Sequence, residues 1–224
     1  MIPEEYFGDW SKVINFKELD TVLKKIGTID PESLCPKPSK VFRAFKLCPY
    51  KDLRVVFVGQ DPYPQKGVAT GVLFGNSSGT PEEDLSPSLK IIRECCIDYS
   101  VPHGPIEFDN TLESWAKQGI LMINSALTCK VNEVGSHAMI WRKFISTFLK
   151  SLSNREMGII YVLFGKQAQT FEPYINSKFN HIIKTEHPAY FARANKSMPH
   201  NIFANINKIL RENYGETIKW YTEY

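Results

Sequence analysis

The sequence predicts an α/β fold, a three-layer α/β/α sandwich around a central four-stranded parallel sheet. Four short apolar runs have the length and β-branched content of strands buried on both faces. The segments between them repeat apolar residues at helical spacing, and strands that alternate with helices form parallel sheets covered on both faces. The expected strands are 55–58, 120–123, 159–164 and 182–184.

Capping signals mark where several of the expected helices begin. These signals are Asn15, Ser39, Ser86 with Pro87, and the pair Asn110 and Glu113. The expected helices cover about 16–26, 39–47, 87–97, 110–119, 136–152 and 201–210, and Lys166 opens one more.

The size of the chain favours one domain. Its 224 residues, 43% of them hydrophobic, can bury one core and are few for two. We therefore expect a single domain over 1–224, with 1–33 as a helical N-terminal extension packed on it. No apolar run approaches the ~20 residues of a membrane span, and the acidic, aromatic start MIPEEYFGDW is unlike a signal peptide. We expect a soluble protein without membrane contact, cytoplasmic if bacterial, and nuclear or in a host-cell compartment if eukaryotic or viral.

The cysteines and the charge exclude some classes of protein. Five cysteines without a CxxC pair favour neither a disulfide framework nor a zinc site, so we expect reduced thiols and no metal. The net charge of +3 is mild. Basic residues gather in 34–54 and 187–201, and each segment is either a nucleic-acid contact or an ordinary solvated face.

Polar residues follow each expected strand directly. They are Gln60 with Asp61, Asn124, Lys166 after Gly165, and His187. The carboxyl ends of parallel strands share one edge of a sheet, and ligands bind there. Four distant segments are therefore expected to converge on one cleft, with Tyr63 and Phe74 as two of its walls.

The side chains expected in this cleft are of types that bind a flat polar ring. The amide of Asn124 offers one acceptor and two donors, which can match the edge of a nucleobase, although an amide after a strand also caps turns. An aromatic wall can stack on such a ring. A carboxylate such as Asp61 can orient water and stabilise positive charge on a sugar, and His187 can stabilise a leaving group. Hydrolysis of an N-glycosidic bond requires these groups.

The stretch GQDPYP (59–64), followed by Phe74, resembles the water-activating loop of the family-1 uracil-DNA glycosylases. The stretches LCPKPSKVFRAF, SPSLKII, SWAKQGILMINSALT, GSH and TEHP also resemble motifs of that family, in the same order. The resemblance covers nearly all of the chain after about residue 34. It implies a monofunctional enzyme that releases uracil from DNA without a cofactor, leaves an abasic site and so initiates base excision repair.

The resemblance also implies roles for single residues. Asp61 would position the attacking water, and His187 would bond the uracil O2 in the transition state. Tyr63 would exclude the methyl group of thymine. The uracil-binding residues would be Gln60, Tyr63, Phe74 and Asn124.

The DNA contacts depart from the family pattern. By resemblance they would be Pro64, Ser88, Lys166, Ala189, Tyr190, Phe191 and Arg193. Pro64 stands where the family usually has histidine, and Lys166 replaces a serine. Ala189, Tyr190 and Phe191 replace Ser-Pro-Leu, which puts Phe191 at the position of the wedge that enters the duplex. We expect an active enzyme with altered DNA affinity and a marked salt dependence.

Two alternatives to an enzyme of this kind come from other classes of protein. Pro64 and the changed segment 189–195 would also suit a glycosylase fold that binds DNA, or serves as a processivity subunit, with little turnover. A nucleotide-binding enzyme such as a kinase is excluded, because the chain has no GxxxxGK[ST] motif. The expected partners are uracil-containing DNA, single- or double-stranded, and a DNA-mimicking inhibitor protein, and the expected state is a monomer.

Overall fold

A four-stranded parallel sheet forms the centre of the computed structural model, which describes residues 2–98, 102–199 and 201–224. The strand order is β4-β2-β6-β7, and each neighbouring pair is parallel. The strands are β2 (Val55–Gly59), β4 (Ile120–Asn124), β6 (Ile160–Phe164) and β7 (His181–Thr185). Every residue of β2, β4 and β6 is buried, which is why these strands are continuous apolar runs.

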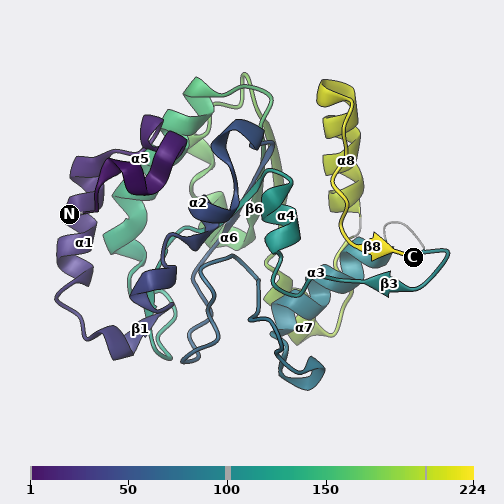
Figure 1. Ribbon diagram of the computed structural model, residues 1–224, viewed down its shortest axis with the longest axis horizontal. Coiled ribbons are helices and arrows are strands. Elements are labelled where there is room, and N and C mark those ends of the chain that lie inside the picture. Colours follow the sequence, from purple (N-terminus) through teal and green to yellow (C-terminus); the bar gives the residue numbers. More distant parts are fainter. Residues whose placement is uncertain (1, 99–101, 200) are drawn as a thin grey trace.

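Helices cover both faces of this sheet (Figure 1). On one side lie α1 (Phe16–Ile26) and α5 (Ala138–Arg155), which pack against each other. On the other side lie α3 (Pro87–Asp98), α4 (Glu113–Lys117) and α8 (Asn201–Tyr214). The predicted three-layer α/β/α class with four parallel strands is confirmed.

The remaining elements are short. Three are helices: α2 (Arg43–Leu47), α6 (Gly165–Gln169) and α7 (Pro188–Ala194). Two ribbons pair β1 (Leu34–Cys35) with β5 (Cys129–Lys130) and β3 (Ile106–Glu107) with β8 (Thr222–Glu223). The 3-10 turns are Glu4–Lys12, Pro31–Ser33, Pro38–Lys40, Tyr50–Asp52, Glu82–Asp84 and Glu172–Tyr174.

The predicted cap of the first helix is confirmed. The side chain of Asn15 accepts a hydrogen bond from the backbone N–H of Glu18 at 3.2 Å, and α1 has the predicted bounds. The helix expected after Ser86 also begins at Pro87. The hydroxyl of Ser86 accepts its bond from the Asn76 amide at 3.1 Å, so this serine also fastens the preceding loop.

Two predicted caps are wrong. Ser39 lies inside a 3-10 turn, and α2 begins only at Arg43, without a side-chain cap. Asn110 does not cap α4. The carboxylate of Asp109 accepts the backbone N–H of Ser114 at 2.8 Å instead, since a charged acceptor bonds a helix N-terminus more strongly than an amide oxygen.

One cluster of buried apolar side chains runs from Phe7 to Trp220 and includes the N-terminal Trp10. The indole of Trp10 donates to the Cys48 carbonyl at 2.9 Å. All five cysteines are buried. Within the described ranges, no helix combines the length and apolar character needed to cross a membrane.

Candidate active site

A cavity of about 360 Å³ opens where the carboxyl ends of β2 and β4 meet the segment that follows β7. Its volume is in the range of small-molecule sites. Ten of the residues singled out in the sequence line it: Gln60, Asp61, Tyr63, Pro64, Phe74, Ser88, Asn124, His187, Ala189 and Arg193. The predicted convergence at one sheet edge is therefore confirmed for three of the four strand ends.

Lys166, Tyr190 and Phe191 do not line the cavity. Lys166 is exposed in the first turn of α6. Phe191 is only 8% exposed and belongs to the core, whereas Tyr190 is 43% exposed. Phe191 is therefore not exposed in this structure, and the wedge role that the family resemblance implies for it stays a prediction. The segment after His187 is a helix, and its 3.6-residue turn puts Phe191 about 200° away from the cavity-lining Ala189.

Asp61 has two oxygens in different surroundings. Its Oδ2 accepts the backbone N–H of Gly135 at 3.1 Å. Its Oδ1 is buried and has no hydrogen-bond partner. Burial raises the pKa of Asp61 above its usual value, against the opposing effects of Gln60 and of the Gly135 bond. The Gly135 N–H, in the loop after β5, thus holds one oxygen in place, and the other can accept a hydrogen bond from water.

Asn124 is the last residue of β4 and lies beside Gly59 of β2. Its Oδ1 is buried and accepts no hydrogen bond, so this oxygen does not cap a turn. A Cβ at Gly59 would lie 2.8 Å from that oxygen and 2.3 Å from Leu73 Cδ1. Glycine at 59 therefore leaves the space in which the amide faces the cavity.

His187 follows β7 and is held in one tautomer. Its Nδ1 accepts the backbone N–H of Ala189 at 3.2 Å, which leaves the proton of the neutral ring on Nε2. Burial, together with the positive charge of Arg193, lowers the pKa of His187 to about 4. The ring is therefore a neutral hydrogen-bond donor at physiological pH.

Tyr63 and Phe74 form adjoining walls, as predicted. The hydroxyl of Tyr63 donates to the Phe74 carbonyl at 3.0 Å. The Phe74 ring packs edge-on against His187, with ring centres 5.5 Å apart, and against Phe164 at 5.0 Å. The Phe74 wall and the His187 ring thus touch each other.

Sequence reasoning missed two residues of the loop after β5. Val134 lines the cavity and is 62% exposed, and Gly135 provides the backbone bond to Asp61. The only signal there was the GSH motif (135–137), which carries no information about a main-chain contact. Across the described residues, no group of three or more His, Cys, Asp or Glu side chains could hold a metal ion.

The sequence pattern of the Uracil DNA glycosylase superfamily matches residues 45–211. The chain belongs to this superfamily. It is 32% identical over 223 residues to a uracil-DNA glycosylase of Fusobacterium nucleatum, with 96% of each chain covered. It is 33% identical to one of Coxiella burnetii, with 97% of this chain and 89% of the relative covered.

Solved structures of glycosylases have the same fold. Mimivirus uracil-DNA glycosylase matches with a TM-score of 0.75 at 22% identity, over 98% of this chain and 89% of that one. A mimivirus UNG variant in complex with UGI also has a TM-score of 0.75, at 26% identity, over 96% and 82% of the two chains. The predicted uracil-DNA glycosylase function, and with it the class of hydrolases acting on N-glycosyl bonds, is confirmed by these relatives and by the superfamily match.

Proposed function

We propose that this glycosylase breaks the N-glycosidic bond of deoxyuridine within the cavity, with Asp61, Asn124 and His187 acting on one flipped uracil nucleotide. One observation carries the proposal. Groups from the ends of three strands line a single cavity, and two of them, Asp61 Oδ1 and Asn124 Oδ1, are buried without a partner. A buried polar atom without a partner costs free energy, which a bound substrate or water would recover.

Asp61 acts on the sugar side of the bond. Gly135 fixes its Oδ2, so Oδ1 can accept a hydrogen bond from the attacking water. As the bond between the sugar and uracil breaks, positive charge develops on the sugar ring, and the carboxylate stabilises it. The water adds to the sugar carbon and gives one proton to the Asp61 carboxylate, which releases it to solvent. The uracil anion takes up a proton from solvent, so the products are free uracil and an abasic site.

His187 acts on the base side. Uracil leaves with the electron pair of the broken bond, and negative charge spreads to its carbonyl oxygens. The neutral ring donates its Nε2–H to the O2 oxygen and stabilises this charge without transferring a proton. The bond from Ala189 to Nδ1 holds the ring in the tautomer that this task requires.

Asn124, Tyr63 and Phe74 select the base. The Asn124 amide can match the donor and acceptor edge of uracil, and a cytosine edge would leave groups unpaired at about 1–3 kcal/mol each. Tyr63 occupies the space into which the methyl group of thymine would project. Phe74 provides the stacking face.

The DNA is held at the rim of the cavity. Ser88 lies in the first turn of α3, where free backbone donors favour a phosphate, and the exposed Arg193 adds a positive charge. Either single- or double-stranded DNA would meet these groups. An inhibitor protein that mimics DNA would bind the same rim, and the mimivirus neighbour in complex with UGI supports this part of the proposal.

The experiment uses an oligonucleotide with one deoxyuridine, incubated in the presence of a chelator. We expect abasic product from the wild type and from Asp84→Asn, which changes an exposed carboxylate that does not line the cavity. Asp61→Asn should give at least about 100-fold less product, as expected for loss of a catalytic carboxylate. No product from well-folded wild type would contradict the proposal. Tight binding without cleavage, unchanged by Asp61→Asn, would instead indicate the DNA-binding alternative.

A further inference from the structure

The segment from Thr70 to Gly75, here called the pocket strap, carries Phe74 to the cavity. Phe74 has φ 66°, in the left-handed region that residues with a Cβ rarely adopt. Such a conformation persists only where the surrounding structure enforces it. The contacts that enforce it therefore also determine where the stacking wall lies.

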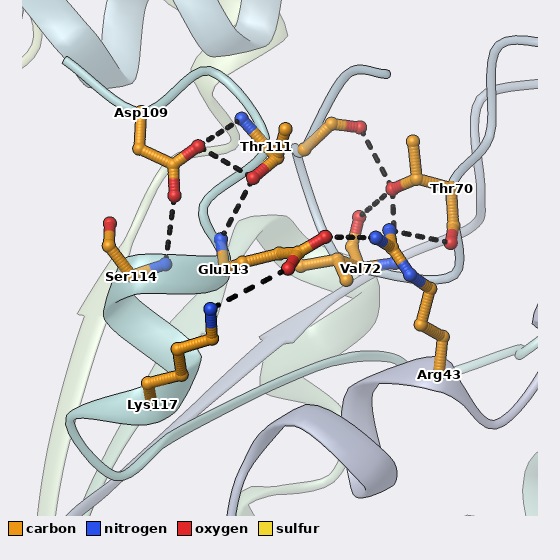
Figure 2. Close-up of polar contacts among 9 residues, drawn as sticks. Arg43, Thr70, Val72, Asp109, Thr111, Glu113, Ser114 and Lys117 are labelled. Carbon is orange, nitrogen blue, oxygen red and sulfur yellow. Dashed lines mark hydrogen bonds and ion pairs between the residues drawn. The ribbon is translucent and has the colours of Figure 1, made fainter. Parts of the chain in front are cut away.

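Bonds inside the strap give it its shape. The Thr70 hydroxyl donates to the Gly75 carbonyl at 3.1 Å and accepts the N–H of Val72 at 3.3 Å. Figure 2 shows Thr70 bonded to Val72 in this way. These bonds close the loop on itself. The middle of the strap is attached to β4 by the Leu73 N–H, which donates to the Met122 carbonyl at 3.2 Å, and to the turn after β2 by the bond from Tyr63 to the Phe74 carbonyl.

The strap lies between the segment leading into α2 and the start of α4. A Cβ at Gly71 would lie 1.8 Å from the Lys40 carbonyl oxygen, and one at Gly75 would lie 2.6 Å from that of Thr111. Both approaches require glycine. The strap therefore touches the segment before α2 on one side and the start of α4 on the other. Such close backbone approaches do not by themselves attract α2 and α4 to each other.

Arg43 and Glu113 provide that attraction (Figure 2). Arg43 of α2 donates through Nη1 to the Thr70 carbonyl at 3.4 Å and pairs through Nη2 with Glu113 Oε1 of α4. Their side chains are 30% and 28% exposed, so water screens the pair only partly. The Thr111 hydroxyl, itself bonded to Asp109, accepts the backbone N–H of Glu113 at 3.3 Å and fixes its position.

We propose that Arg43 and Glu113 are positioning residues for uracil. Their ion pair clamps the strap between α2 and α4 and so keeps the Phe74 ring against the cavity. Neither residue lines the cavity, and both act through Phe74. The inference rests on the proposed stacking role of Phe74. Asp61 and His187 lie on other segments, so the chemical step itself does not depend on the clamp.

The test measures kcat and KM on a uracil-containing oligonucleotide, well below the melting temperature. Arg43→Gln keeps the side-chain length and removes the charge. We expect its KM to rise about tenfold, within the range of coupling between residues in contact. Its kcat should change less than about twofold, because a stacking contact present throughout the reaction is uniform binding. Arg43→Lys should restore part of the loss, and Glu113→Gln should reproduce it.

Two comparisons separate positioning from general stability. In a Phe74→Ala background, Arg43→Gln should raise KM no further, because the ring through which it acts is gone. Arg93→Gln breaks another Arg–Glu pair, with Glu82, whose residues do not line the cavity. It should leave KM unchanged even if it lowers the melting temperature.

A lower melting temperature with unchanged KM in both Arg43→Gln and Glu113→Gln would overturn the inference, as would full additivity with Phe74→Ala. If Phe74→Ala itself leaves KM unchanged while Asp61→Asn abolishes product, the stacking role and the clamp both fail, but the glycosylase mechanism stands. Glu113→Gln leaves the Arg43–Thr70 bond in place, so it provides the test if Arg43→Gln does not fold.

Discussion

Asp61 has a carboxylate whose burial works against stability at neutral pH. Its pKa in the folded protein is raised by burial, so the fold binds the proton more tightly than the unfolded chain does. The resulting cost is present above the usual carboxyl pKa and disappears as the pH falls below it. The folded protein would therefore be more stable with an uncharged side chain in place of the Asp61 carboxylate.

Asp61→Asn should separate activity from stability. The amide can keep the Gly135 bond through its oxygen and removes the buried charge. We expect the free energy of unfolding at pH 7 to rise by ~1 kcal/mol, a typical gain when a functional strain is relieved, while product formation is lost. Urea denaturation measures the first and the oligonucleotide assay the second. A variant that is both inactive and less stable would show that Asp61 contributes to folding as well.

The pH dependence of activity tests the protonation state of His187. With a pKa of about 4 instead of 6.5, it stays neutral in the fold while the unfolded chain takes up a proton. Its contribution to stability is therefore complete above the unfolded pKa and is lost as the pH falls from 6.5 toward 4. We expect activity without an inflection near 6.5, measured as kcat/KM between about pH 5 and 8.

The matched variant for this prediction is His181→Gln, at an exposed histidine on β7. It should keep both the wild-type activity and its pH profile, whereas His187→Gln should lose most of the activity. A kcat/KM inflection near 6.5 that persists in His181→Gln would contradict the account, because His187 would then take up a proton in that range.

At the scale of elements, the contact between the ends of β6 and β7 fixes His187. Gly165 has φ 83°, and a Cβ there would lie 2.9 Å from His187 Cβ. Gly165→Ala should lower kcat by about tenfold or more, because a displacement of order 1 Å from the reactive geometry is costly. Gly215→Ala provides the matched control, since Gly215 has φ 70° but no neighbour within 4 Å. Equal losses of activity in both variants would contradict the role of the contact.

Helix α7 carries two adjacent aromatic residues, the buried Phe191 and the exposed Tyr190. Phe191→Ala should lower the free energy of unfolding by about 3–5 kcal/mol, as truncation of a buried phenylalanine does. Tyr190→Ala should change it by less than about 1 kcal/mol, because surface substitutions rarely do more. Chemical denaturation of the two variants checks this. The reverse order would restore Phe191 as the exposed wedge.

The sequence predicted the strands well because burial on both faces leaves an unmistakable apolar run, as in β2 and β6. Helix α7 (Pro188–Ala194) was missed because its seven residues are too few to show a helical repeat of apolar side chains. Caps depend on competition between neighbouring side chains, which is why Asp109 replaced Asn110. Neither the Gly135 bond nor the Arg43–Glu113 pair is visible in local sequence, since each joins segments far apart in the chain.

For the molecule as a whole, the parallel topology of the sheet is what brings the site residues together. Because β2, β4 and β7 point the same way, their carboxyl ends bring residues 61, 124 and 187 to one cavity, and Figure 1 shows the helices that enclose the sheet. Asn124 lies on a strand, and Asp61 and His187 each lie two residues beyond a strand end, so the rigid sheet limits how far all three side chains can move. The account predicts that this arrangement receives the base without large rearrangement of the sheet.

A crystal structure of the protein with uracil bound tests that claim most directly. The account predicts uracil in the cavity with its ring against Phe74, its edge within about 3.2 Å of the Asn124 amide and a carbonyl oxygen at a similar distance from His187 Nε2. Uracil bound elsewhere, or in the cavity with the Asn124 amide unbonded, would contradict it.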